Sequence, residues 1–351
     1  MPVKAAPQLP VCDLEDIKEM TRELWHEVAG KRFFITGGTG FFGMWLLESF
    51  THINDCLSLG MRAAVLTRDP ARFIAKAPHL SGRADLHFLQ GDIRNFHFPV
   101  RKVDYLIHAA TDASATLNSE SPLEMLSTIV DGTRHLLDFA ARAGVQKLLF
   151  TSSGAVYGRQ PSELTHIPES YPGAPDSLLL HSAYGEGKRM AEHLCALYAQ
   201  KYGFEAKIAR CFAFVGPYLP LNAHFAIGNF IRDAMRGHDI TVMGDGTPMR
   251  SYLYAADLAV WLWTILFSAP SARAYNVGSA EDLSISDLAG QVREALCSKS
   301  GVIITRQPDP HRPIERYVPD ITRAEEELGL RVQTSLPEAL RRTEQWHQVA
   351  G

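Results

Sequence analysis

The stretch Phe33-Phe-Ile-Thr-Gly-Gly-Thr-Gly-Phe-Phe-Gly43 joins an apolar run to a cluster of glycines and the start of a second apolar run. Gly38, Gly40 and Gly43 fit the spacing GxGxxG, and Gly37, Gly40 and Gly43 fit GxxGxxG. Glycines at these spacings allow a tight turn, close approach of the backbone to a pyrophosphate and close packing of a helix on a strand. A helix that begins there offers free N–H groups to phosphates. The stretch therefore predicts the strand, turn and helix of a dinucleotide-binding fold.

Strand-like and helix-like segments alternate after this stretch. Apolar runs typical of buried strands occupy residues 32–36, 62–67, 86–90, 105–109, 147–151 and 206–210. Helix-like stretches separate them, notably 42–52, 121–143 and 183–202. Because such alternation is typical of a parallel sheet covered by helices on both faces, we expect an α/β protein with a Rossmann, doubly wound parallel sheet.

The two ends of the chain differ from this middle part. Residues 13–29 carry apolar side chains at helical spacing, with Asp13 as the expected N-cap and Gly30 as the expected stop. This helix packs on the body or mediates self-association, and packing is the simpler expectation. After about residue 212, glycines, prolines and aromatic residues interrupt shorter elements. We predict a helical extension over 1–30, a dinucleotide-binding domain over 31–212, and a smaller substrate-binding α/β region over 213–351, interleaved with the first.

Composition limits the partners. The chain has 351 residues, of which 46% are hydrophobic and 21% charged, with a formal net charge of −4. This balance gives no sign of nucleic acid or an anionic membrane as a partner. The longest apolar run, 258–267, is about half of the roughly 20 residues that a spanning helix needs, so we expect a buried helix there.

Cysteine and histidine usage bears on compartment and metals. The five cysteines lie far apart without a CxxC pair, which favours a reducing compartment, no disulfide framework and no zinc site. We therefore expect a cytoplasmic protein. The 14 histidines form no metal-like cluster along the chain, so no metal is expected.

The end of the second strand bears on the choice of dinucleotide. An acid that binds the adenosine ribose is expected about 20 residues after the glycines, but Thr67-Arg68-Asp69 stands there. Arg68 could accommodate the 2′-phosphate of NADP, or it could stack on adenine with NAD bound, and both readings stay open. Asp92 and Ile93 are expected to flank the adenine.

The segment Ser182-Ala-Tyr-Gly-Glu-Gly-Lys188 carries the candidate chemistry. Tyr184 and Lys188 are four residues apart and therefore share a helix face. A lysine ammonium beside a phenol favours the phenolate, which moves a group with a usual pKa of about 10 toward working pH. Ser153, at the end of a strand, could orient a substrate hydroxyl. Together these residues predict proton transfer at an O–H group while hydride passes to a nicotinamide.

The order of several motifs resembles the extended short-chain dehydrogenase/reductase family of nucleotide-sugar epimerases and dehydratases. The motifs are TGGTGFFG (36–43), HAAT (108–111), TSSGAVYG (151–158), SAYGEGK (182–188) and GDGTPMRSYLYAAD (244–257), and the resemblance covers residues 31–346. It implies that Ser153, Tyr184 and Lys188 are the catalytic residues. It also implies a homodimer formed through paired surface helices.

The same resemblance implies the binding residues. Asn229 and Arg250 would hold a nucleotide diphosphate, and Val242, within 240–243, would flank the base; Arg250 suits this task because its planar guanidinium can bind phosphate oxygens in pairs. The dinucleotide would be bound by Gly37, Gly40, Phe41, Phe42, Gly43, Arg68, Asp92, Ile93, Ala109, Ala110, Thr111, Thr151, Tyr184 and Lys188.

The two small residues Gly154 and Ala155 narrow the reaction. The family's 4,6-dehydratases carry an Asp-Glu pair there, and its UDP-glucuronate decarboxylases carry a Glu nearby. Elimination needs a general acid and a general base, so these small residues predict redox chemistry at a carbinol without elimination, unless Asp112 or Glu186 supplies the carboxylate. Ile129 and Ala213 stand where many family members have Asn, so the resemblance does not identify the sugar of the substrate.

We therefore expect a nucleotide-sugar 4-epimerase that uses NAD or NADP and acts on a nucleotide-diphosphate sugar. The main alternative is an NADPH-dependent reductase of nucleotide-4-keto-6-deoxysugars, which Arg68 favours. A nucleotide-sugar dehydratase and a non-catalytic dinucleotide-binding protein are further alternatives.

Overall fold

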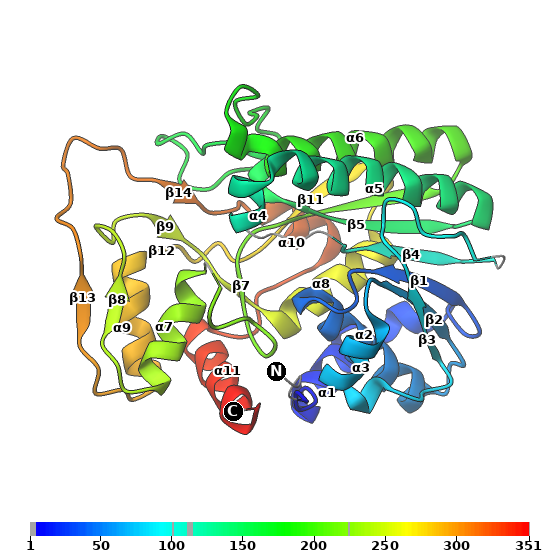
Figure 1. Cartoon of the computed structure of the whole chain (residues 1–351), viewed down its shortest axis with the longest axis horizontal. Helices are drawn as coiled ribbons and strands as arrows, with labels where there is room; N and C mark the ends of the chain where they lie inside the picture. The colour runs from blue at the N-terminus through cyan, green and yellow to red at the C-terminus, as the bar shows by residue number, and fades with distance from the viewer. Residues whose placement is uncertain (1–4, 100–101, 111–114, 224, 351) are drawn as a thin grey trace. The chain divides into compact units, whose positions relative to one another are not determined.

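The computed structural model describes residues 5–99, 102–110, 115–223 and 225–350. Its main feature is a seven-stranded sheet with the strand order β3-β2-β1-β4-β5-β6-β11 (Figure 1). The pairs β2·β3, β1·β2, β1·β4 and β4·β5 are parallel. The strands are β1 (Arg32–Thr36), β2 (Arg62–Thr67), β3 (Leu86–Gln90), β4 (Tyr105–His108), β5 (Lys147–Ser153), β6 (Glu205–Cys211) and β11 (Arg273–Val277).

The strand order changes direction between β1 and β4, which is the arrangement of a Rossmann sheet. The expected α/β fold with a doubly wound parallel sheet is therefore confirmed. Strands β1, β2 and β3 have the predicted bounds, and β4, β5 and β6 differ from the prediction by one or two residues.

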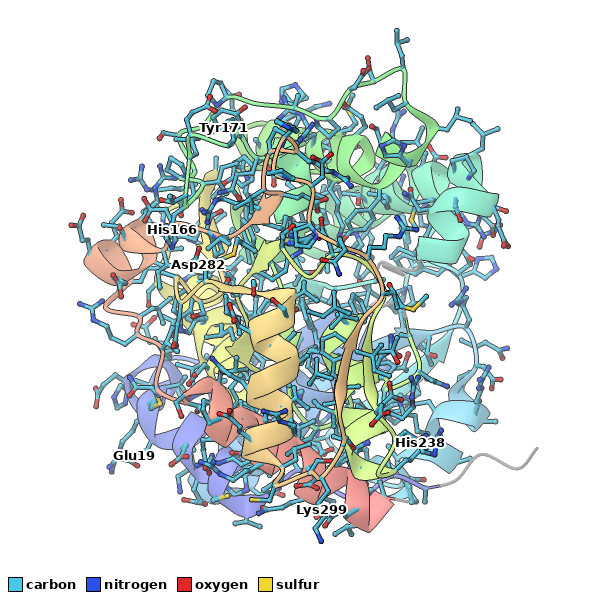
Figure 2. All side chains as sticks on the ribbon, turned by 90° about the vertical axis from the view of Figure 1, so that its left-hand side faces the viewer. Glu19, His166, Tyr171, His238, Asp282 and Lys299 are labelled. Carbon is cyan, nitrogen blue, oxygen red and sulfur yellow. The ribbon has the colours of Figure 1, made fainter. Side chains whose placement is uncertain are left out.

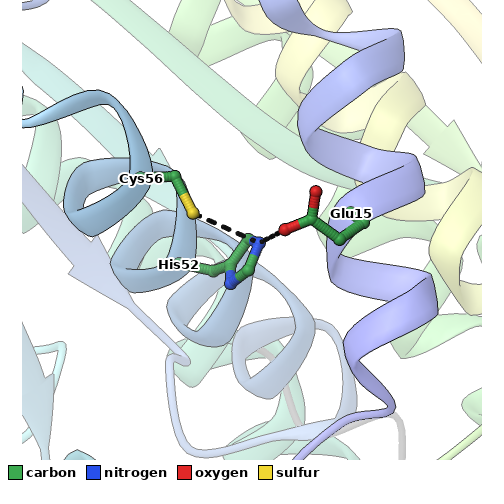
Figure 3. A group of neighbouring side chains, drawn as sticks. All are labelled: Glu15, His52 and Cys56. Atoms are coloured by element: carbon green, nitrogen blue, oxygen red, sulfur yellow. Dashed lines mark hydrogen bonds and ion pairs between the residues drawn. The ribbon is translucent and has the colours of Figure 1, made fainter.

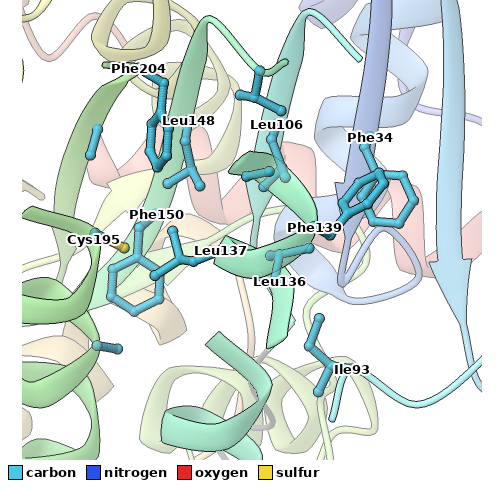
Figure 4. Close-up of a cluster of buried hydrophobic side chains, with 14 of the residues drawn as sticks. Phe34, Ile93, Leu106, Leu136, Leu137, Phe139, Leu148, Phe150, Cys195 and Phe204 are labelled. Carbon is cyan, nitrogen blue, oxygen red and sulfur yellow. The ribbon is translucent and has the colours of Figure 1, made fainter. Parts of the chain in front are cut away.

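Successive side chains of β1 pack against helices on opposite faces of the sheet. Phe34 lies 4.7 Å from the ring of Phe139 on α5 (Pro122–Ala143), within the apolar cluster that Figure 4 shows. Phe33 points to the opposite face, 5.2 Å from Phe50 on α2 (Phe41–Leu57) and 6.1 Å from Trp263 on α8 (Ala255–Ser268). Because successive side chains of a strand point to opposite faces, the apolar run of β1 is covered by helices on both sides.

The apolar run 258–267 lies within α8, and most of its side chains are buried. Within the described residues, no helix is both long enough and apolar enough to cross a membrane.

The N-terminal helix is shorter than predicted. Helix α1 spans Val11–Met20, and Asp13 lies buried inside it, so the expectation that Asp13 is the N-cap is wrong. The helix ends at Met20, and its C-cap Thr21 donates its hydroxyl to the Ile17 carbonyl at 2.6 Å and accepts a bond from Trp25 Nε1 at 2.9 Å. This geometry turns the chain into the short 3₁₀ helix η1 (Arg22–Trp25), which buries Trp25.

The prediction that Gly30 ends the N-terminal helix is wrong, because α1 ends at Met20 and η1 at Trp25. Gly30 has a φ of +69° in the turn that leads into β1, where its N–H donates to the carbonyl of Leu59 at 2.8 Å.

The chain divides into two compact units. Unit 1 contains Met1–Gly158, Ala174–Arg210 and Ala259–Tyr275, and unit 2 contains Arg159–Gly173, Cys211–Leu258 and Asn276–Gly351. Unit 1 also holds α3 (Pro70–Lys76), α4 (Ala115–Glu120) and α6 (Ala183–Tyr202). The helices of unit 2 are α7 (Ala226–Met235), α9 (Ile285–Ala295), α10 (Thr322–Leu328) and α11 (Leu336–Ala350).

Unit 2 also contains three small sheets. Their orders are β10-β7, β12-β9-β14 and β13-β8. The strands are β7 (Phe214–Val215), β8 (Ile240–Val242), β9 (Met249–Arg250), β10 (Leu253–Tyr254), β12 (Leu283–Ser284), β13 (Val302–Ile304) and β14 (Arg316–Tyr317).

Polar contacts attach the segment 159–173 to the rest of unit 2. His166 Nε2 is hydrogen-bonded to the carbonyl of Ala280 at 2.8 Å, near Asp282 (Figure 2). The buried carboxylate of Glu169 accepts the N–H of Asn276 at 2.8 Å, and burial raises its pKa. Unit 2 is thus assembled from three separate stretches of chain.

Candidate active site

The glycine loop between β1 and α2 is shaped by close backbone contacts. Gly37 has a φ of +73°, and a Cβ there would lie 2.3 Å from the carbonyl of Ala109. A Cβ at Gly43 would lie 2.3 Å from the carbonyl oxygen of Gly37. At Gly40 the nearest atom to a Cβ would be 3.5 Å away, which is an ordinary contact. Packing within the chain therefore requires glycine at 37 and 43 but not at 40.

Gly40 is the N-cap of α2 and supplies no side-chain cap, and the first turn of α2 has no acidic residue. The N–H groups of that turn are consequently suited to an anion from outside the chain. This uncapped helix end fits the pyrophosphate of a dinucleotide.

At the end of β2, the charged side chains of Arg68 and Asp69 are both exposed. Asp69 is engaged as the N-cap of α3, where its carboxylate accepts the N–H of Arg72 at 2.9 Å. Thr67 is nearly buried. The position expected to meet the adenosine ribose therefore has Thr67, the cation Arg68 and the carboxylate of Asp69, which already caps α3.

The residues expected near adenine include a pairing that the sequence analysis missed. Asp92 accepts two bonds from the guanidinium of Arg94, both at 2.8 Å, and these bonds lower the pKa of Asp92. Ile93 is buried, and a Cβ at Gly132 would lie 2.8 Å from its Cγ2, so Ile93 packs closely on α5. The Asp-x-Arg spacing was the available signal for the pair.

The remaining predicted dinucleotide residues surround the glycine loop. Phe41 and Phe42 begin α2, are half-buried, and have ring centroids 5.8 Å apart. Ala109 and Ala110 follow β4, and their backbone faces Gly37. The predicted residues Thr111 and Asp112 lie outside the described residues.

The catalytic candidates come from β5 and α6. Lys188 is 2% exposed, and its ammonium donates to the carbonyl of Thr151 at 2.7 Å. The same ammonium lies 5.9 Å from the ring centroid of Tyr184. Ser153 follows Thr151 by two residues on β5, so both side chains point to the same face of the strand. The structure thus brings Tyr184, Lys188 and Thr151 together and places Ser153 at the adjoining strand end.

Glycines on α6 let this helix approach its neighbours. A Cβ at Gly185 would lie 2.7 Å from the carbonyl of Ala155, in the 3₁₀ turn η3 (Gly154–Tyr157). A Cβ at Gly187 would lie 3.2 Å from Cδ1 of Ile129 on α5. Close packing on both sides of Lys188 therefore fixes the position of its helix turn.

His108 is a buried neutral residue. Its Nδ1 is hydrogen-bonded to Thr36 Oγ1 and its Nε2 to Thr133 Oγ1, both at 2.9 Å. Burial, and then the charge of Lys188, lower its pKa to about 3. The imidazole therefore joins β4 to β1 and α5 and is unsuited to be a catalytic acid at neutral pH.

A buried ion pair lies beside the catalytic strand and was not predicted. The guanidinium of Arg210 donates to Glu192 through Nε at 3.0 Å and Nη2 at 2.7 Å, and Ser152 donates to the same carboxylate at 2.5 Å. Burial alone would lower the pKa of Arg210, but these bonds to Glu192 raise it overall. The carboxylate of Glu192 is thus occupied by Arg210 and Ser152.

The turn η3 after Ser153 contains no acidic residue of its own, and Asp112 lies outside the described residues. Gly154 and Ala155 offer no acid there. Glu186 is half-buried and follows Tyr184 by two residues, so it does not share the helix face of Tyr184.

The predicted substrate residues all lie in unit 2. Asn229, on α7, donates to the carbonyl of Ala223 at 3.0 Å and accepts a bond from Arg232 at 2.8 Å. Arg250, on β9, forms an ion pair with Glu315, a partner that the sequence analysis missed. The side chain of Val242 is buried on β8. Their role in binding stays a prediction.

A Rossmann sheet with this glycine loop and a Tyr-x-x-x-Lys helix beside a strand-terminal serine defines an enzyme of the extended short-chain dehydrogenase/reductase type. The chain belongs to the NAD dependent epimerase/dehydratase family, whose model matches residues 33–278. The resemblance seen in the motifs, and with it the expectation of a nicotinamide-dependent enzyme, is confirmed.

Curated relatives and solved structures resemble nearly the whole chain. UDP-glucuronic acid decarboxylase 5 of Arabidopsis thaliana is 32% identical over 88% of this chain and 87% of its own length. UDP-glucuronic acid decarboxylase 1 of Danio rerio is 30% identical over 90% and 72%.

Among solved structures, dTDP-glucose 4,6-dehydratase from Streptomyces venezuelae with NAD bound has a TM-score of 0.77 and 25% identity, covering 91% of this chain and 97% of that one. UDP-glucose 4-epimerase from Thermus thermophilus in complex with NAD has a TM-score of 0.73 and 26% identity, covering 90% and 99%.

Proposed function

We propose that the chain is a nucleotide-sugar 4-epimerase that oxidises C4 of the sugar transiently and reduces it again. The observation that carries the proposal is the grouping of Tyr184 and Lys188 beside the strand end at Ser153, followed by Gly154 and Ala155 in place of acidic residues. Such a site can transfer a proton at a carbinol but supplies no acid or base at that turn for elimination.

The proton steps follow from the side chains. Tyr184 takes the proton of the C4 hydroxyl, and the hydroxyl of Ser153 holds the same oxygen. Lys188, fixed by its bond to the Thr151 carbonyl, places a positive charge beside the phenol. A bound nicotinamide dinucleotide would accept the C4 hydride and return it to the opposite face of the 4-keto sugar. Tyr184 then returns the proton to the C4 oxygen, so that no atom is gained or lost.

The binding sites are proposed from the two units. Gly37, Gly40, Gly43 and the start of α2 would hold the dinucleotide, and Asn229 and Arg250 of unit 2 would hold the substrate diphosphate. The solved structures of UDP-glucose 4-epimerase and dTDP-glucose 4,6-dehydratase support a nucleotide-sugar substrate. The curated decarboxylase relatives support the same substrate class.

Decarboxylation is less well supported than epimerisation, although curated relatives carry out that reaction. The turn after Ser153 has Gly154 and Ala155, and the nearby Glu192 is bound by Arg210 and Ser152. A reaction that stops at the 4-keto sugar and reverses asks for no further acidic side chain at this turn.

One observation favours a second candidate, an NADPH-dependent 4-ketoreductase. Arg68 is exposed at the end of β2 while Asp69 is engaged as a helix cap. A cation in that position suits a 2′-phosphate. The same Ser153, Tyr184 and Lys188 would then deliver a proton to a 4-keto sugar in a single direction.

Two further features are proposed. The outward-facing Leu123 of α5 and Met190 and Leu197 of α6 are exposed, which supports a homodimer formed through these helices.

The cysteines of the described chain are free, which supports a reducing, cytoplasmic compartment.

The test uses the purified full chain with UDP-, dTDP-, GDP- and CDP-hexoses deuterated at C4, and with UDP-glucuronate. We expect the 4-epimer of one substrate, with unchanged mass and deuterium retained at C4. Loss of water or carbon dioxide from a substrate would overturn the proposal in favour of a dehydratase or a decarboxylase.

The cofactor separates the two candidates. Denatured, freshly purified protein that releases one NAD per chain supports the epimerase, because the hydride returns to the same substrate. Protein that is empty, binds NADPH far better than NADH and consumes it with a 4-keto sugar supports the reductase.

A further inference from the structure

Three side chains with metal-binding atoms converge on the helices α1 and α2 of unit 1. His52 and Cys56 are four residues apart on α2 and share one face. Glu15 reaches them from α1: its Oε1 lies 2.7 Å from His52 Nε2, which lies 3.6 Å from Cys56 Sγ. Figure 3 shows the imidazole between the sulfur and the carboxylate. In the part of the chain that the structure describes, no other group of three or more such side chains converges in this way.

The spacing of the three atoms suits a tetrahedral ion. Bonds of about 2.0–2.3 Å from zinc to N, O and S place neighbouring ligand atoms about 3.3–3.6 Å apart. The separation of His52 Nε2 and Cys56 Sγ already has this value. The His52–Glu15 separation must open by about half an ångström on this geometry, and the Glu15 side chain is 46% exposed, which leaves room for this movement.

We propose that Glu15, His52 and Cys56 bind a zinc ion, with water as the fourth ligand. A carboxylate, an imidazole and a thiolate together suit zinc and exclude the oxygen-seeking Mg²⁺ and Ca²⁺. Binding deprotonates the Cys56 thiol, whose proton leaves to solvent, and uses the neutral His52 ring with its proton on Nδ1. Lys18 holds the second oxygen of Glu15 in an ion pair and so orients the first toward the ion.

The site has a structural consequence. Gly40 begins α2 and His52 lies twelve residues further along it, about 18 Å away along the helix axis. The ion is thus remote from the glycine loop and ties the N-terminal helix α1 to the dinucleotide-binding unit. The expectation that no metal binds rested on spacing along the chain, and Glu15 is 37 residues from His52.

Cobalt(II) is the probe, because a four-coordinate cobalt thiolate has intense d–d bands and a sulfur-to-cobalt charge-transfer band. The full chain is stripped with a chelator, desalted under reducing conditions and titrated with Co²⁺. We expect saturation at one cobalt per chain and displacement by Zn²⁺. Cys56→Ser removes the charge-transfer band, and Glu15→Gln and His52→Gln weaken cobalt binding at least about tenfold.

The other two exposed cysteines provide matched controls. Cys12→Ser and Cys297→Ser leave the spectrum and the cobalt affinity unchanged. Zinc also raises the Tm of the wild-type chain and leaves that of Cys56→Ser unchanged, with circular dichroism showing that the variant is folded. The absence of a charge-transfer band in the wild type, its survival in Cys56→Ser or its loss in a control variant overturns the site. These readouts do not depend on the enzyme's substrate.

Discussion

At the scale of single residues, substitutions at Gly40 and Gly43 distinguish a glycine needed for dinucleotide binding from a glycine needed for folding. Gly43→Ala places a Cβ 2.3 Å from the carbonyl oxygen of Gly37, so we expect the free energy of unfolding to fall by about 3 kcal/mol. Gly40→Ala meets nothing closer than 3.5 Å, so we expect a change within about 1 kcal/mol. Urea unfolding measures both values.

The same pair tests the dinucleotide site. Gly40→Ala should weaken binding of NAD or NADP at least about tenfold, because its methyl group occupies space over the uncapped N–H groups of α2. Calorimetric titration of the folded variant gives the affinity. Unchanged affinity would contradict the placement of the pyrophosphate at Gly40.

Tyr184 is the second residue with a defined consequence. Tyr184→Phe removes only the hydroxyl that carries the proton, so we expect turnover to fall by about 10²–10⁴ with a nearly unchanged Tm. Turnover is measured with the substrate found in the deuterium experiment. The control is Tyr202→Phe, an exposed tyrosine at the end of the same helix, which should retain full activity. Normal turnover by Tyr184→Phe would refute the catalytic assignment.

His108 makes stability depend on pH. Burial lowers its pKa from the usual 6.5 to about 3, so between these values the unfolded chain binds a proton that the folded chain does not. Stability from this group is complete above pH 6.5 and falls as pH decreases toward 3, by at most about 1.4 kcal/mol per pH unit.

Urea unfolding of the wild type and His108→Gln from pH 7 to 4 measures this effect. We expect a shallower decrease in the variant, because glutamine does not titrate. His347, whose pKa burial lowers to about 4, contributes in the same direction in both proteins and cancels in the comparison. Equal slopes would show that His108 binds protons equally in the folded and unfolded chains, and would contradict its lowered pKa.

At the scale of elements, the pair Glu192–Arg210 joins α6 to β6. The side chains are 13% and 16% exposed, so removing one charge leaves the other poorly solvated. Glu192→Gln should lower the free energy of unfolding by about 3 kcal/mol. Glu19→Gln, which breaks the exposed pair with Arg22, should cost less than about 1 kcal/mol. Similar decreases in the free energy of unfolding of the two variants would contradict the structural role of the Glu192–Arg210 pair.

The long elements could be predicted because their apolar patterns are continuous. Strands β1, β2 and β3 and helix α6 have the predicted bounds. The N-terminal helix was predicted too long, because apolar spacing does not show where α1 gives way to the 3₁₀ helix η1 that follows it. Several strands of unit 2, such as β9, have two residues and are too short for any periodicity to show.

The candidate site shows the same limit. Motif residues such as Tyr184 and Lys188 were found because their spacing within one helix carries the signal. The partners of charged residues were missed, since Glu192 and Arg210 are 18 residues apart and Arg250 and Glu315 are 65 apart. Only the folded chain brings such pairs into contact, and the convergence of Glu15 with His52 was missed for the same reason.

At the scale of the whole molecule, the two units should respond to different ligands. The dinucleotide residues lie in unit 1, whereas Asn229 and Arg250 lie in unit 2. Hydrogen exchange with NADH should slow most in peptides that cover β1 and the start of α2. Exchange with UDP, or with the nucleoside diphosphate of the identified substrate, should slow most in peptides that cover α7 and β9.

Arg250 gives this division a sharp test. Arg250→Met removes a charged donor to the diphosphate, so the nucleoside diphosphate should bind at least about tenfold more weakly while NADH still protects β1. The control is Arg293→Met, at an arginine of unit 2 whose side chain is 43% exposed, which should leave both patterns intact. If the nucleoside diphosphate slowed exchange mainly around the glycine loop, or if Arg250→Met abolished NADH protection, unit 2 would not be the substrate-binding region. Independent responses would instead support the assignment of dinucleotide binding to unit 1 and of nucleoside-diphosphate binding to unit 2, because each ligand would then protect only the unit that holds its predicted residues.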